Sequence, residues 1–428
     1  MKGPLSVAAL LLVCGLLLSG CGLMQPPQTY MRLPKLPAQE AELMERVLAN
    51  LPSDAAILRP RKSTQASMLP IRDMNGDGRD EAVVFYKLKE SNDQIAGEIW
   101  SRSDAGWEKM TTIQGEGYDL DMLRLVDLLP GGKPALVVGY VAGSQNGLSI
   151  YAFEGGELKR LFQTPYNELV IDDMNEDGQQ DLTIFTRSRE RNQIGGSAVL
   201  YQYEQEAFAK KGSTEMDPFV NAYYTVMVGQ AMPGRKSIVL DGGVGAHSSY
   251  TQLIIWEKGN LKAVFPDASN PTFRAYSAVS SDVNEDGVID IPLMLTPPGW
   301  EGKAMVEMQW IYAYMNWDGG TGLTYVMERY ISNAQGFYFD VPKEWKGTYT
   351  FEPQAQSIRF VAVHDRKTLA EIRYVPIDKW KEGAEPGWTP LVRTSTTVYA
   401  VNTDSYDMAR NAFHLVTESP ELAEEGKP

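Results

Sequence analysis

The amino-acid sequence predicts a mainly β protein in which one antiparallel sheet unit recurs along the chain, followed by a small α+β domain near the C-terminus. Two observations lead to this prediction. A loop rich in Asp and Asn recurs about every 50 residues, and the main copies are followed by apolar runs typical of buried strands. A second motif, an aromatic strand that ends in a turn, recurs in phase with the first. Two features that keep one period are hard to obtain by chance, so we interpret them as internal repeats.

The N-terminal residues 1–20 form a leader that takes no part in the fold. Their apolar run, from Leu5 to Leu18, is short for a membrane span. The run ends in LSGC, which resembles the lipobox of bacterial lipoproteins, where the peptide is cut before the cysteine and the cysteine is acylated. The resemblance implies a protein anchored by lipid at Cys21 to the extracytoplasmic face of the cell membrane. An ordinary secretory signal or a short anchor helix is the alternative.

A linker and a helix precede the repeats. Residues 21–37 are rich in proline and predict an extended spacer, and residues 38–67 predict a helix with a lead-in to the sheets. The helix covers residues 38–50, AQEAELMERVLAN. Its apolar side chains fall on one stripe, as expected for a helix that packs on a core. These side chains are Leu43, Met44, Val47 and Leu48.

Composition excludes several classes of partner and chemistry. The chain has 40 Lys and Arg against 55 Asp and Glu, a net charge of −15, which argues against nucleic acid and against electrostatic attraction to anionic lipid. Its 2 cysteines are Cys14, in the leader, and Cys21, the predicted lipid site. The mature chain then has no thiol for a disulfide, a nucleophile or a thiolate metal site.

The acidic loops have the oxygen spacing of a calcium site. They read DMNGDGRDE from Asp73, DMNEDGQQD from Asp173 and DVNEDGVID from Asp282. Calcium prefers six to eight oxygens, and such a loop offers side chains at positions 1, 3 and 5, a backbone carbonyl at 7 and a carboxylate at 9. Glycine at position 6 permits the sharp turn. We therefore predict about three calcium ions, and a solvated polar turn is the alternative.

The predicted ligands follow from these positions. They are Asp73, Asn75, Asp77, Arg79 (carbonyl) and Glu81 in the first loop; Asp173, Asn175, Asp177, Gln179 (carbonyl) and Asp181 in the second; and Asp282, Asn284, Asp286, Val288 (carbonyl) and Asp290 in the third. Asp80 competes with Glu81 for the last place. These are not EF-hands, because position 12 holds Val84, Ile184 or Leu293 where that motif needs Glu, and strands follow the loops.

Two further copies of the loop are degenerate. DLLPGGKPALVV begins at Asp127 and QAMPGRKSIVL begins at Gln230, and both lack the ligand residues. We expect Pro-Gly turns there and no metal. The aromatic hairpin motif follows each of the five loops by about half a repeat. Its copies are IWSRSDAGW, IYAFEGGEL, LYQYEQEAF, IIWEKGNL and MNWDGGTGL.

The repeated D-x-N-x-D-G-x-x-D loop between strands resembles the FG-GAP repeats of integrin α subunits and the VCBS-type repeats of bacterial surface proteins. The resemblance spans residues 68–330. It implies a β-propeller in which each repeat forms a four-stranded blade and calcium occupies loops within the blades. Five repeats can be counted here, whereas the family more often closes with six or seven.

The region after the repeats changes pattern. Residues 331–417 open with GFYFDVPKEW, carry no acidic loop and predict a separate small α+β domain, and residues 418–428 form an acidic tail.

No catalytic residue stands out in the sequence. His247 with Asp241 and Ser248 or Ser249 forms a Ser/His/Asp set of a kind that arises by chance, since no nucleophile-elbow sequence surrounds either serine. His364 lies beside Asp365 at a strand end. Four tryptophans of the repeats are candidates for either core or a sugar-binding face. They are Trp256, Trp300, Trp310 and Trp317.

Two functions remain open. The first is a calcium-binding adhesion or scaffold module, anchored to the membrane, for an envelope glycan or protein. The alternative is an envelope hydrolase or lyase, acting on a polysaccharide or an ester, that is built on a propeller. Fold alone does not choose between them.

Overall fold

The computed structural model describes residues 38–62, 69–88, 94–143, 145–190, 193–265, 270–381 and 386–418. The predicted leader, the lipidation site at Cys21, the linker over 21–37 and nearly all of the acidic tail lie outside these residues. Strands make up 59% of the described residues, as a mainly β fold requires. Among the described helices, none is both long and apolar enough to cross a membrane. The chain divides into two compact units, residues 1–119 and 120–428.

The first unit is one helix on one sheet. Helix α3 spans Ala38–Asn50, which are the bounds expected from the sequence. Leu43 and Val47 are fully buried in a cluster with Trp100 and Trp107 of the sheet. Leu48 was expected on the same stripe, but 61% of it is exposed, so the buried stripe is narrower than predicted. The strands are β1 (Ala55–Ile57), β2 (Ile71–Arg72), β3 (Glu81–Leu88), β4 (Gln94–Ser103) and β5 (Gly106–Gln114). They pair antiparallel in the order β1-β3-β4-β5, with β2 also on β3.

Three four-stranded sheets open the second unit, and each pairs its strands in chain order. The first holds β6 (Asp119–Leu129), β7 (Lys133–Val141), β8 (Asn146–Glu154) and β9 (Glu157–Tyr166). The next holds β10 (Glu168–Asp172), β11 (Asp181–Glu190), β12 (Gln193–Glu204) and β13 (Ala207–Met216). The third holds β14 (Val220–Met232), β15 (Arg235–Val244), β16 (Ser248–Glu257) and β17 (Asn260–Ala263).

Two five-stranded sheets complete the second unit. One has the order β18-β19-β20-β21-β27, and the other has the order β22-β23-β24-β26-β25. The strands of the first are β18 (Ile291–Leu295), β19 (Ile311–Trp317), β20 (Leu323–Ser332), β21 (Phe337–Val341) and β27 (Phe413–Leu415). Those of the second are β22 (Tyr349–Pro353), β23 (Ser357–Ala362), β24 (Thr368–Pro376), β25 (Trp388–Arg393) and β26 (Thr397–Asn402).

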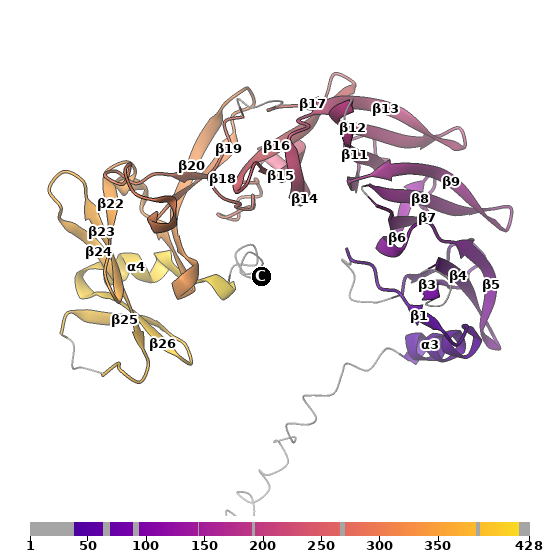
Figure 1. Cartoon of the computed structure of the whole chain (residues 1–428), viewed down its shortest axis with the longest axis horizontal. Helices are drawn as coiled ribbons and strands as arrows, with labels where there is room; N and C mark the ends of the chain where they lie inside the picture. The colour runs from indigo at the N-terminus through magenta and orange to yellow at the C-terminus, as the bar shows by residue number, and fades with distance from the viewer. Residues whose placement is uncertain are drawn as a thin grey trace, which may run out of the picture. The chain divides into compact units, whose positions relative to one another are not determined.

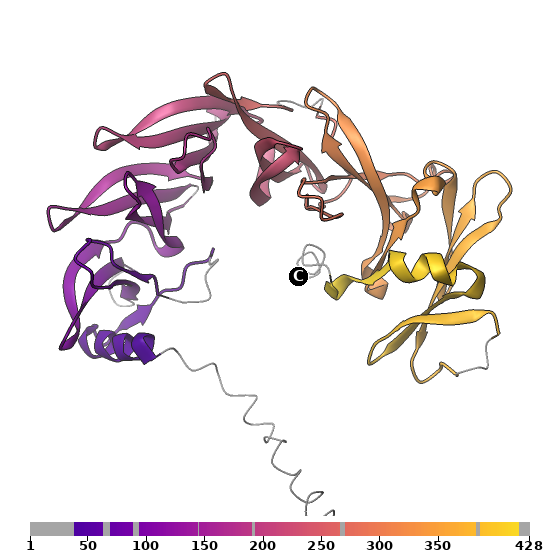
Figure 2. The same cartoon turned by 180° about the vertical axis from the view of Figure 1, so that it is seen from behind.

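Strand pairing continues across the domain boundary expected at residue 331. That boundary falls inside β20, and β21 and β27 add to the same sheet because Tyr330 pairs with Phe339 and Phe339 pairs with Phe413. Helix α4 (Tyr406–Ala412) lies against the last sheet, with its Ala409 buried in the cluster that joins these two sheets (Figure 2). The C-terminal residues are therefore continuous with the repeat region through hydrogen bonds and through a shared core.

Consecutive sheets of the second unit pack on one another (Figure 1). One cluster joins Leu148 of β8 to Ile184 of β11, and the next joins Phe185 of β11 to Ile238 of β15. One further cluster joins the sheet of β14–β17 to Trp317 of β19. Another joins the sheet that begins with β18 to the sheet that begins with β22. Antiparallel sheets stacked in chain order are consistent with a propeller-like fold. The number of blades stays a prediction.

The two sequence motifs occupy matching places in the sheets. Each full acidic loop leads into a strand of a sheet, namely β3 or β11, which are interior strands, or β18, which is an edge strand. Each aromatic hairpin turn joins the next two strands, as β12 and β13 do through Tyr203 and Phe208. In the degenerate copies, short turns at Gly131 and Gly234 replace the long loop, both in the left-handed region.

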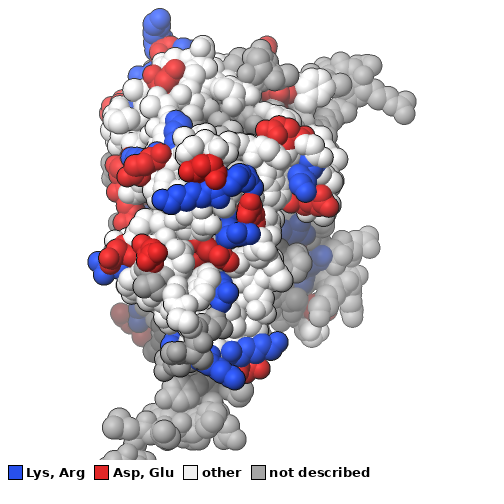
Figure 3. Space-filling model, turned by 90° about the vertical axis from the view of Figure 1, so that its left-hand side faces the viewer, with Lys and Arg blue, Asp and Glu red and all other residues white. Residues whose placement is uncertain are grey.

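The surface mixes charges of both signs. On the face drawn in Figure 3, acidic and basic side chains alternate and do not gather by sign. Near the last sheet, for example, Glu352 of β22 forms ion pairs with both Arg359 and Arg366. Opposite charges thus neutralise each other locally near the last sheet.

Candidate functional site

The acidic loops share one backbone path. In the loop from Asp173, position 4 (Glu176) and position 6 (Gly178) both have positive φ, of 59° and 90°. In the loop from Asp282, the same positions, Glu285 and Gly287, have φ of 59° and 84°. Glycine at position 6 is needed because other residues pay a steric cost in this region. The motif therefore folds as a repeated structural unit.

The carboxylates at positions 1 and 5 accept hydrogen bonds from the amides of their own loop. Asp173 Oδ2 accepts from the amide of Gly178 at 2.8 Å, and its Oδ1 accepts from that of Asp177 at 3.0 Å. Asp177 Oδ1 accepts from the amide of Gln179 at 2.9 Å. The loops from Asp73 and Asp282 repeat this pattern. Such bonds shape the loop, and they point its oxygens in fixed directions.

The closing carboxylate at position 9 is buried in all three loops. Glu81, Asp181 and Asp290 are each fully buried, and each accepts a hydrogen bond from the amide at position 2. The second oxygen differs between loops. Glu81 Oε1 accepts from the hydroxyl of Ser101 at 2.9 Å, and Asp290 Oδ1 accepts from Asn316 Nδ2 at 2.7 Å. Asp181 Oδ1 is buried without a hydrogen-bond partner among the described residues.

Burial sets the protonation of these closing carboxylates. It raises the pKa of Asp181 to about 6 and that of Asp290 to about 6, and it also raises the pKa of Glu81. By contrast, a hydrogen bond from Gln202 holds the pKa of Asp177 below its ordinary value. A carboxylate removed from water favours its neutral form unless a cation or more donors compensate. A bound divalent ion would supply that compensation.

The loops partly fit a calcium ion. Among the described residues, no group of three or more His, Cys, Asp and Glu side chains is placed to hold a metal. The predicted shell, however, also uses an Asn oxygen and a backbone carbonyl, so convergence of acidic groups alone does not decide the matter. The buried, unpartnered Oδ1 of Asp181 and its raised pKa are the observations that fit a cation best. In the loop from Asp173, Asn175 Nδ2 donates to Asp177 Oδ2 at 2.9 Å, and the amide of Asn175 donates to Asp181 Oδ2 at 3.2 Å.

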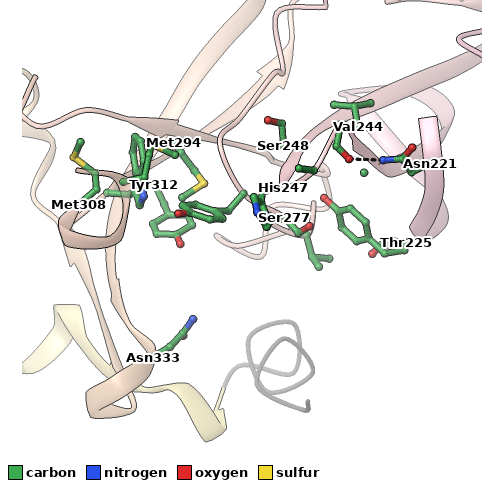
Figure 4. Close-up of a pocket in the computed structure, with 18 of the residues that line it drawn as sticks. Asn221, Thr225, Val244, His247, Ser248, Ser277, Met294, Met308, Tyr312 and Asn333 are labelled. Carbon is green, nitrogen blue, oxygen red and sulfur yellow. Dashed lines mark hydrogen bonds between the residues drawn. The ribbon is translucent and has the colours of Figure 1, made fainter. Parts of the chain in front are cut away.

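A pocket lies in the second unit, between residues of β14, the turn from β15 to β16, and the connections around β18 and β19. We call it the aromatic pocket, and its volume is about 1260 Å³. It is lined by Asn221, Tyr224, Thr225, Val226, Met227, Gly243, Val244, Gly245, Ala246, His247, Ser248, Tyr276, Ser277, Val279, Met294, Met305, Val306, Met308, Trp310, Tyr312 and Asn333. Figure 4 shows His247, Ser277, Met294 and Tyr312 on its walls.

The aromatic pocket contains a row of three rings. Tyr276 is at the centre, with its ring centroid 6.4 Å from that of His247 and 6.5 Å from that of Trp310. Tyr276 and Trp310 meet edge to face, with an interplanar angle of 73°. Each ring comes from a different connection between strands. The row therefore exists only because tertiary structure brings three irregular segments together.

A buried ion pair supports this pocket from behind. Arg274 and Asp241 are both fully buried, and Arg274 Nη2 lies 3.0 Å from Asp241 Oδ1. The same Nη2 donates to the hydroxyl of Tyr224 at 2.9 Å and to the carbonyl of Ala278 at 2.5 Å. Asp241 also accepts from Ser280, through its amide at 2.7 Å and its hydroxyl at 2.8 Å. These bonds fix the segment that carries Tyr276 and Ser277.

The catalytic sets considered from the sequence are not assembled as such. Asp241 is engaged by Arg274 and Ser280, and the hydroxyl of Ser249 donates to the carbonyl of Tyr276 at 2.8 Å. His247 is exposed at the rim of the pocket. His364 Nε2 lies 3.2 Å from Asp365 Oδ2, and both side chains are exposed, so this pair is a surface contact.

The four tryptophans considered for a sugar-binding face divide into two groups. Trp256, Trp300 and Trp317 pack in hydrophobic clusters, which is the core role. Trp310 lines the aromatic pocket. Sequence reasoning singled out His247 and Trp310 separately but missed Tyr276, Tyr224 and Arg274. No periodic signal marks Tyr276 and Arg274, which lie in an irregular connection, and Tyr224 lies in β14 at a shift of the strand register.

Comparison with known proteins gives only distant similarity. No protein-family model matches the chain, and no curated protein matches it. Among solved structures, rhamnogalacturonan lyase YesW has 8% identity and a TM-score of 0.34, with 73% of this chain and 69% of that chain covered. A rhamnogalacturonan lyase of Bacillus licheniformis has 10% identity, the same TM-score of 0.34 and the same coverage of 73% and 69%. A protein described as a 6-phosphogluconolactonase of Bacteroides uniformis has 9% identity and a TM-score of 0.30, with 73% and 93% covered.

These neighbours are β-propeller-like enzymes. Their TM-scores are too low to support a statement about this chain's activity, and the activities in their names are their own. The architecture described above rests on strand pairing and on the packing of consecutive sheets.

Proposed function

We propose that this protein is a lipid-anchored, extracytoplasmic binding module that holds a cell-envelope ligand, a glycan or a protein, in the aromatic pocket. The observation that carries the proposal is the pocket itself. It is large, it contains a row of aromatic rings, and a fully buried Arg274–Asp241 pair keeps its wall in place. A preformed concave site with aromatic walls and a few polar groups is what ligand binding requires.

We further propose that calcium stabilises the three sheets that carry the acidic loops, one of which, the sheet that begins with β18, contributes to this pocket. The ion would be held in each loop by the side chains at positions 1, 3, 5 and 9 and by the carbonyl at position 7. When bound, calcium would supply positive charge to the buried closing carboxylates. The loop from Asp282 leads into β18, whose Met294 lines the pocket. Calcium there would thus stabilise a strand that shapes the binding site.

Attachment to the membrane is the third part of the proposal. The LSGC sequence before Cys21 and the proline-rich spacer behind it support a lipid anchor at the extracytoplasmic face. An anchored module of this kind would keep its pocket close to the envelope while leaving it free to reach a ligand.

A hydrolase or lyase built on the same fold is the competing function. Such enzymes use a pair of carboxylates or another acid and base within reach of the substrate. Among the described residues that line the aromatic pocket, His247 carries the side chain that would serve as an acid or base. An assay of polysaccharide and ester cleavage distinguishes the two functions. Cleavage of a polysaccharide or an ester that is lost in His247→Ala would show that the protein is an enzyme.

The proposed function is tested by binding to envelope material. The purified full-length chain, in lipid nanodiscs, is mixed with cell-envelope fractions of the organism that produces it. We expect saturable binding that Tyr276→Ala abolishes or strongly weakens, because Tyr276 is the centre of the aromatic row. Tyr325→Phe is the matched control, since Tyr325 belongs to β20 and does not line the pocket. Envelope binding that is absent, or that Tyr276→Ala leaves intact, would exclude this function for the pocket.

A further inference from the structure

We infer that the ligand of the aromatic pocket is an uncharged glycan, with sugar rings stacked on Tyr276 and Trp310. This inference rests on the proposed function, since it names the chemical class that the proposed site would bind. It depends on the charge, the ring geometry and the polar groups of the pocket.

The lining of the pocket is uncharged. Among its described lining residues there is no Lys, Arg, Asp or Glu, although the chain carries 40 basic and 55 acidic residues. Behind the wall, Arg274 and Asp241 form a buried ion pair in which the two charges neutralise each other. Recognition of an anionic glycan or a phosphate normally uses Arg or Lys at the contact. The missing counter-charge and the net charge of −15 both disfavour an anion and favour a neutral ligand.

The aromatic row offers faces and edges at several orientations. The rings of Tyr276 and Trp310 are inclined at 73°, and those of His247 and Tyr276 are inclined at 46°. A pyranose ring has an apolar face of C–H groups and a rim of hydroxyls, so it packs its face on an aromatic ring and keeps its rim free to form hydrogen bonds. Inclined rings suit a bent chain of linked sugars. The volume of about 1260 Å³ exceeds the ~300–1,000 Å³ of an ordinary small-molecule pocket, which favours an oligosaccharide over a single sugar.

Polar side chains are also among the residues that line the pocket. Thr225, Ser248, Ser277 and Asn333 line the pocket and provide hydroxyl and amide groups. Asn221 Nδ2 donates to the carbonyl of Gly245 at 2.6 Å, which orients this amide at the rim (Figure 4). A wholly apolar ligand would cover these groups without satisfying them, at a cost of about 1–3 kcal/mol for each. The hydroxyls of a glycan satisfy them.

The rival ligand is an apolar peptide. Met227, Met294, Met305 and Met308 also line the pocket, and methionine adapts to varied apolar surfaces. A glycan is nevertheless favoured because the aromatic row is buttressed by buried hydrogen bonds. Arg274 holds Tyr224 and Ala278, and Ser249 holds the carbonyl of Tyr276. A rigid wall suits stacking on a flat face more than it suits induced fit around varied side chains.

Binding to a glycan array tests the inference directly. The full-length chain in nanodiscs is applied to immobilised neutral oligosaccharides, anionic oligosaccharides and apolar peptides. We expect binding to neutral oligosaccharides, weakened about tenfold or more in Trp310→Ala. Trp310→Phe should retain part of the affinity, because a smaller ring still stacks. Trp388→Ala is the control for loss of a half-buried tryptophan, since Trp388 lies on β25 under Arg373 and outside the pocket.

The outcomes separate this inference from the proposed function. Binding only to anionic oligosaccharides or to apolar peptides, or to none of the neutral ones, would overturn the glycan inference. In the envelope experiment, binding to envelope fractions that survives protease treatment of those fractions, and disappears after their periodate oxidation, supports a glycan. Binding that disappears after protease treatment alone would contradict the glycan inference but would still support the proposed binding module. Equal melting temperatures of the chain and its variants ensure that lost binding does not reflect lost folding.

Discussion

At the scale of single residues, the closing carboxylates of the acidic loops are acids whose burial disfavours their ionised form. Asp181 and Asp290 are fully buried, and burial raises both pKa values to about 6. Asp181 differs because one of its oxygens has no hydrogen-bond partner among the described residues. A fold that keeps an acid in this state is expected to lose stability when the acid ionises, unless a cation is bound.

The first prediction concerns calcium. An extracellular calcium site with a Kd of ~0.1 mM, at about 1 mM calcium, contributes ~1.4 kcal/mol to the free energy of unfolding. Adding calcium to chelated protein should therefore raise the melting temperature, and Asp177→Ala or Asp286→Ala should each remove part of the rise. Asp127→Ala should leave the rise unchanged, because its turn lacks the motif. Melting that is indifferent to chelator, with no heat of binding at millimolar calcium, would reduce the loops to polar turns.

The second prediction concerns pH in the presence of chelator. In the folded chain the pKa of Asp181 is about 6, and its ordinary pKa, which applies in the unfolded chain, is 3.8. Between pH ~4 and ~6 the folded chain therefore holds a proton on Asp181 that the unfolded chain has released. The free energy of unfolding should therefore fall as pH rises through this interval, by the contribution of this group. Asp181→Asn should flatten this part of the melting profile relative to the unmodified protein. With saturating calcium the free energy of unfolding should instead rise with pH, because protons compete with the ion for the carboxylate oxygens. A profile that is the same for both proteins would contradict the raised pKa.

At the scale of elements, the connections between strands decide what the second unit presents at its surface. The segment around Arg274 pairs with β16 through backbone bonds between Ser249 and Arg274 in both directions, at 2.9 and 3.0 Å. Its buried guanidinium then fixes the backbone at Ala278. Backbone and side-chain hydrogen bonds thereby attach this segment to β16 and to the interior.

The third prediction tests this connection. Asp241→Asn or Arg274→Met leaves one buried partner uncompensated, which typically costs about 3–5 kcal/mol of unfolding free energy. The double substitution Asp241→Leu with Arg274→Met removes both charges and should recover much of that loss, as measured by urea unfolding. It should still bind less ligand, because Tyr224 loses the hydrogen bond from Arg274. A double variant as unstable as the sum of the two single variants would show that the pair does not act as a unit.

The fourth prediction concerns helix α3. Leu43 is fully buried against the first sheet, whereas Leu48 is 61% exposed, although both are leucines of one helix. Leu43→Ala should destabilise the first unit by about 2–5 kcal/mol. Leu48→Ala should change stability by only about 0.5 kcal/mol or less. Thermal unfolding of the two variants measures the difference, and equal effects would contradict the packing of α3.

At the scale of the whole molecule, the described chain consists of two compact units that carry the same kind of sheet. In the second unit, four hydrophobic clusters join five sheets in sequence, so no sheet there is stabilised alone. Loss of one sheet is therefore expected to weaken its neighbours, as in other repeat architectures.

The fifth prediction concerns where the whole protein resides. Cys21→Ser removes the predicted lipidation site, so the protein should leave the membrane fraction or remain unprocessed. Fractionation with mass measurement of the product checks this, and Cys14→Ser, within the leader, is the matched control. A Cys21→Ser protein that stays on the membrane at its processed mass would refute the lipid anchor.

The sequence by itself determined the local and periodic features of this protein. The spacing of oxygens located the acidic loops, the apolar stripe gave the bounds of α3, and Pro-Gly pairs marked the tight turns near Gly131 and Gly234. These features depend on contacts between residues close in sequence, so a single chain reveals them.

Tertiary structure alone decided the aromatic pocket, the buried Arg274–Asp241 pair behind it and the addition of β21 and β27 to the sheet that begins with β18. Tyr276 and Trp310 come from irregular connections, and Arg274 meets Asp241 across 33 positions of sequence. Such contacts depend on how sheets and connections pack in space. A residue pattern with a period of two reports which face of a strand is buried, but not which distant segment covers it.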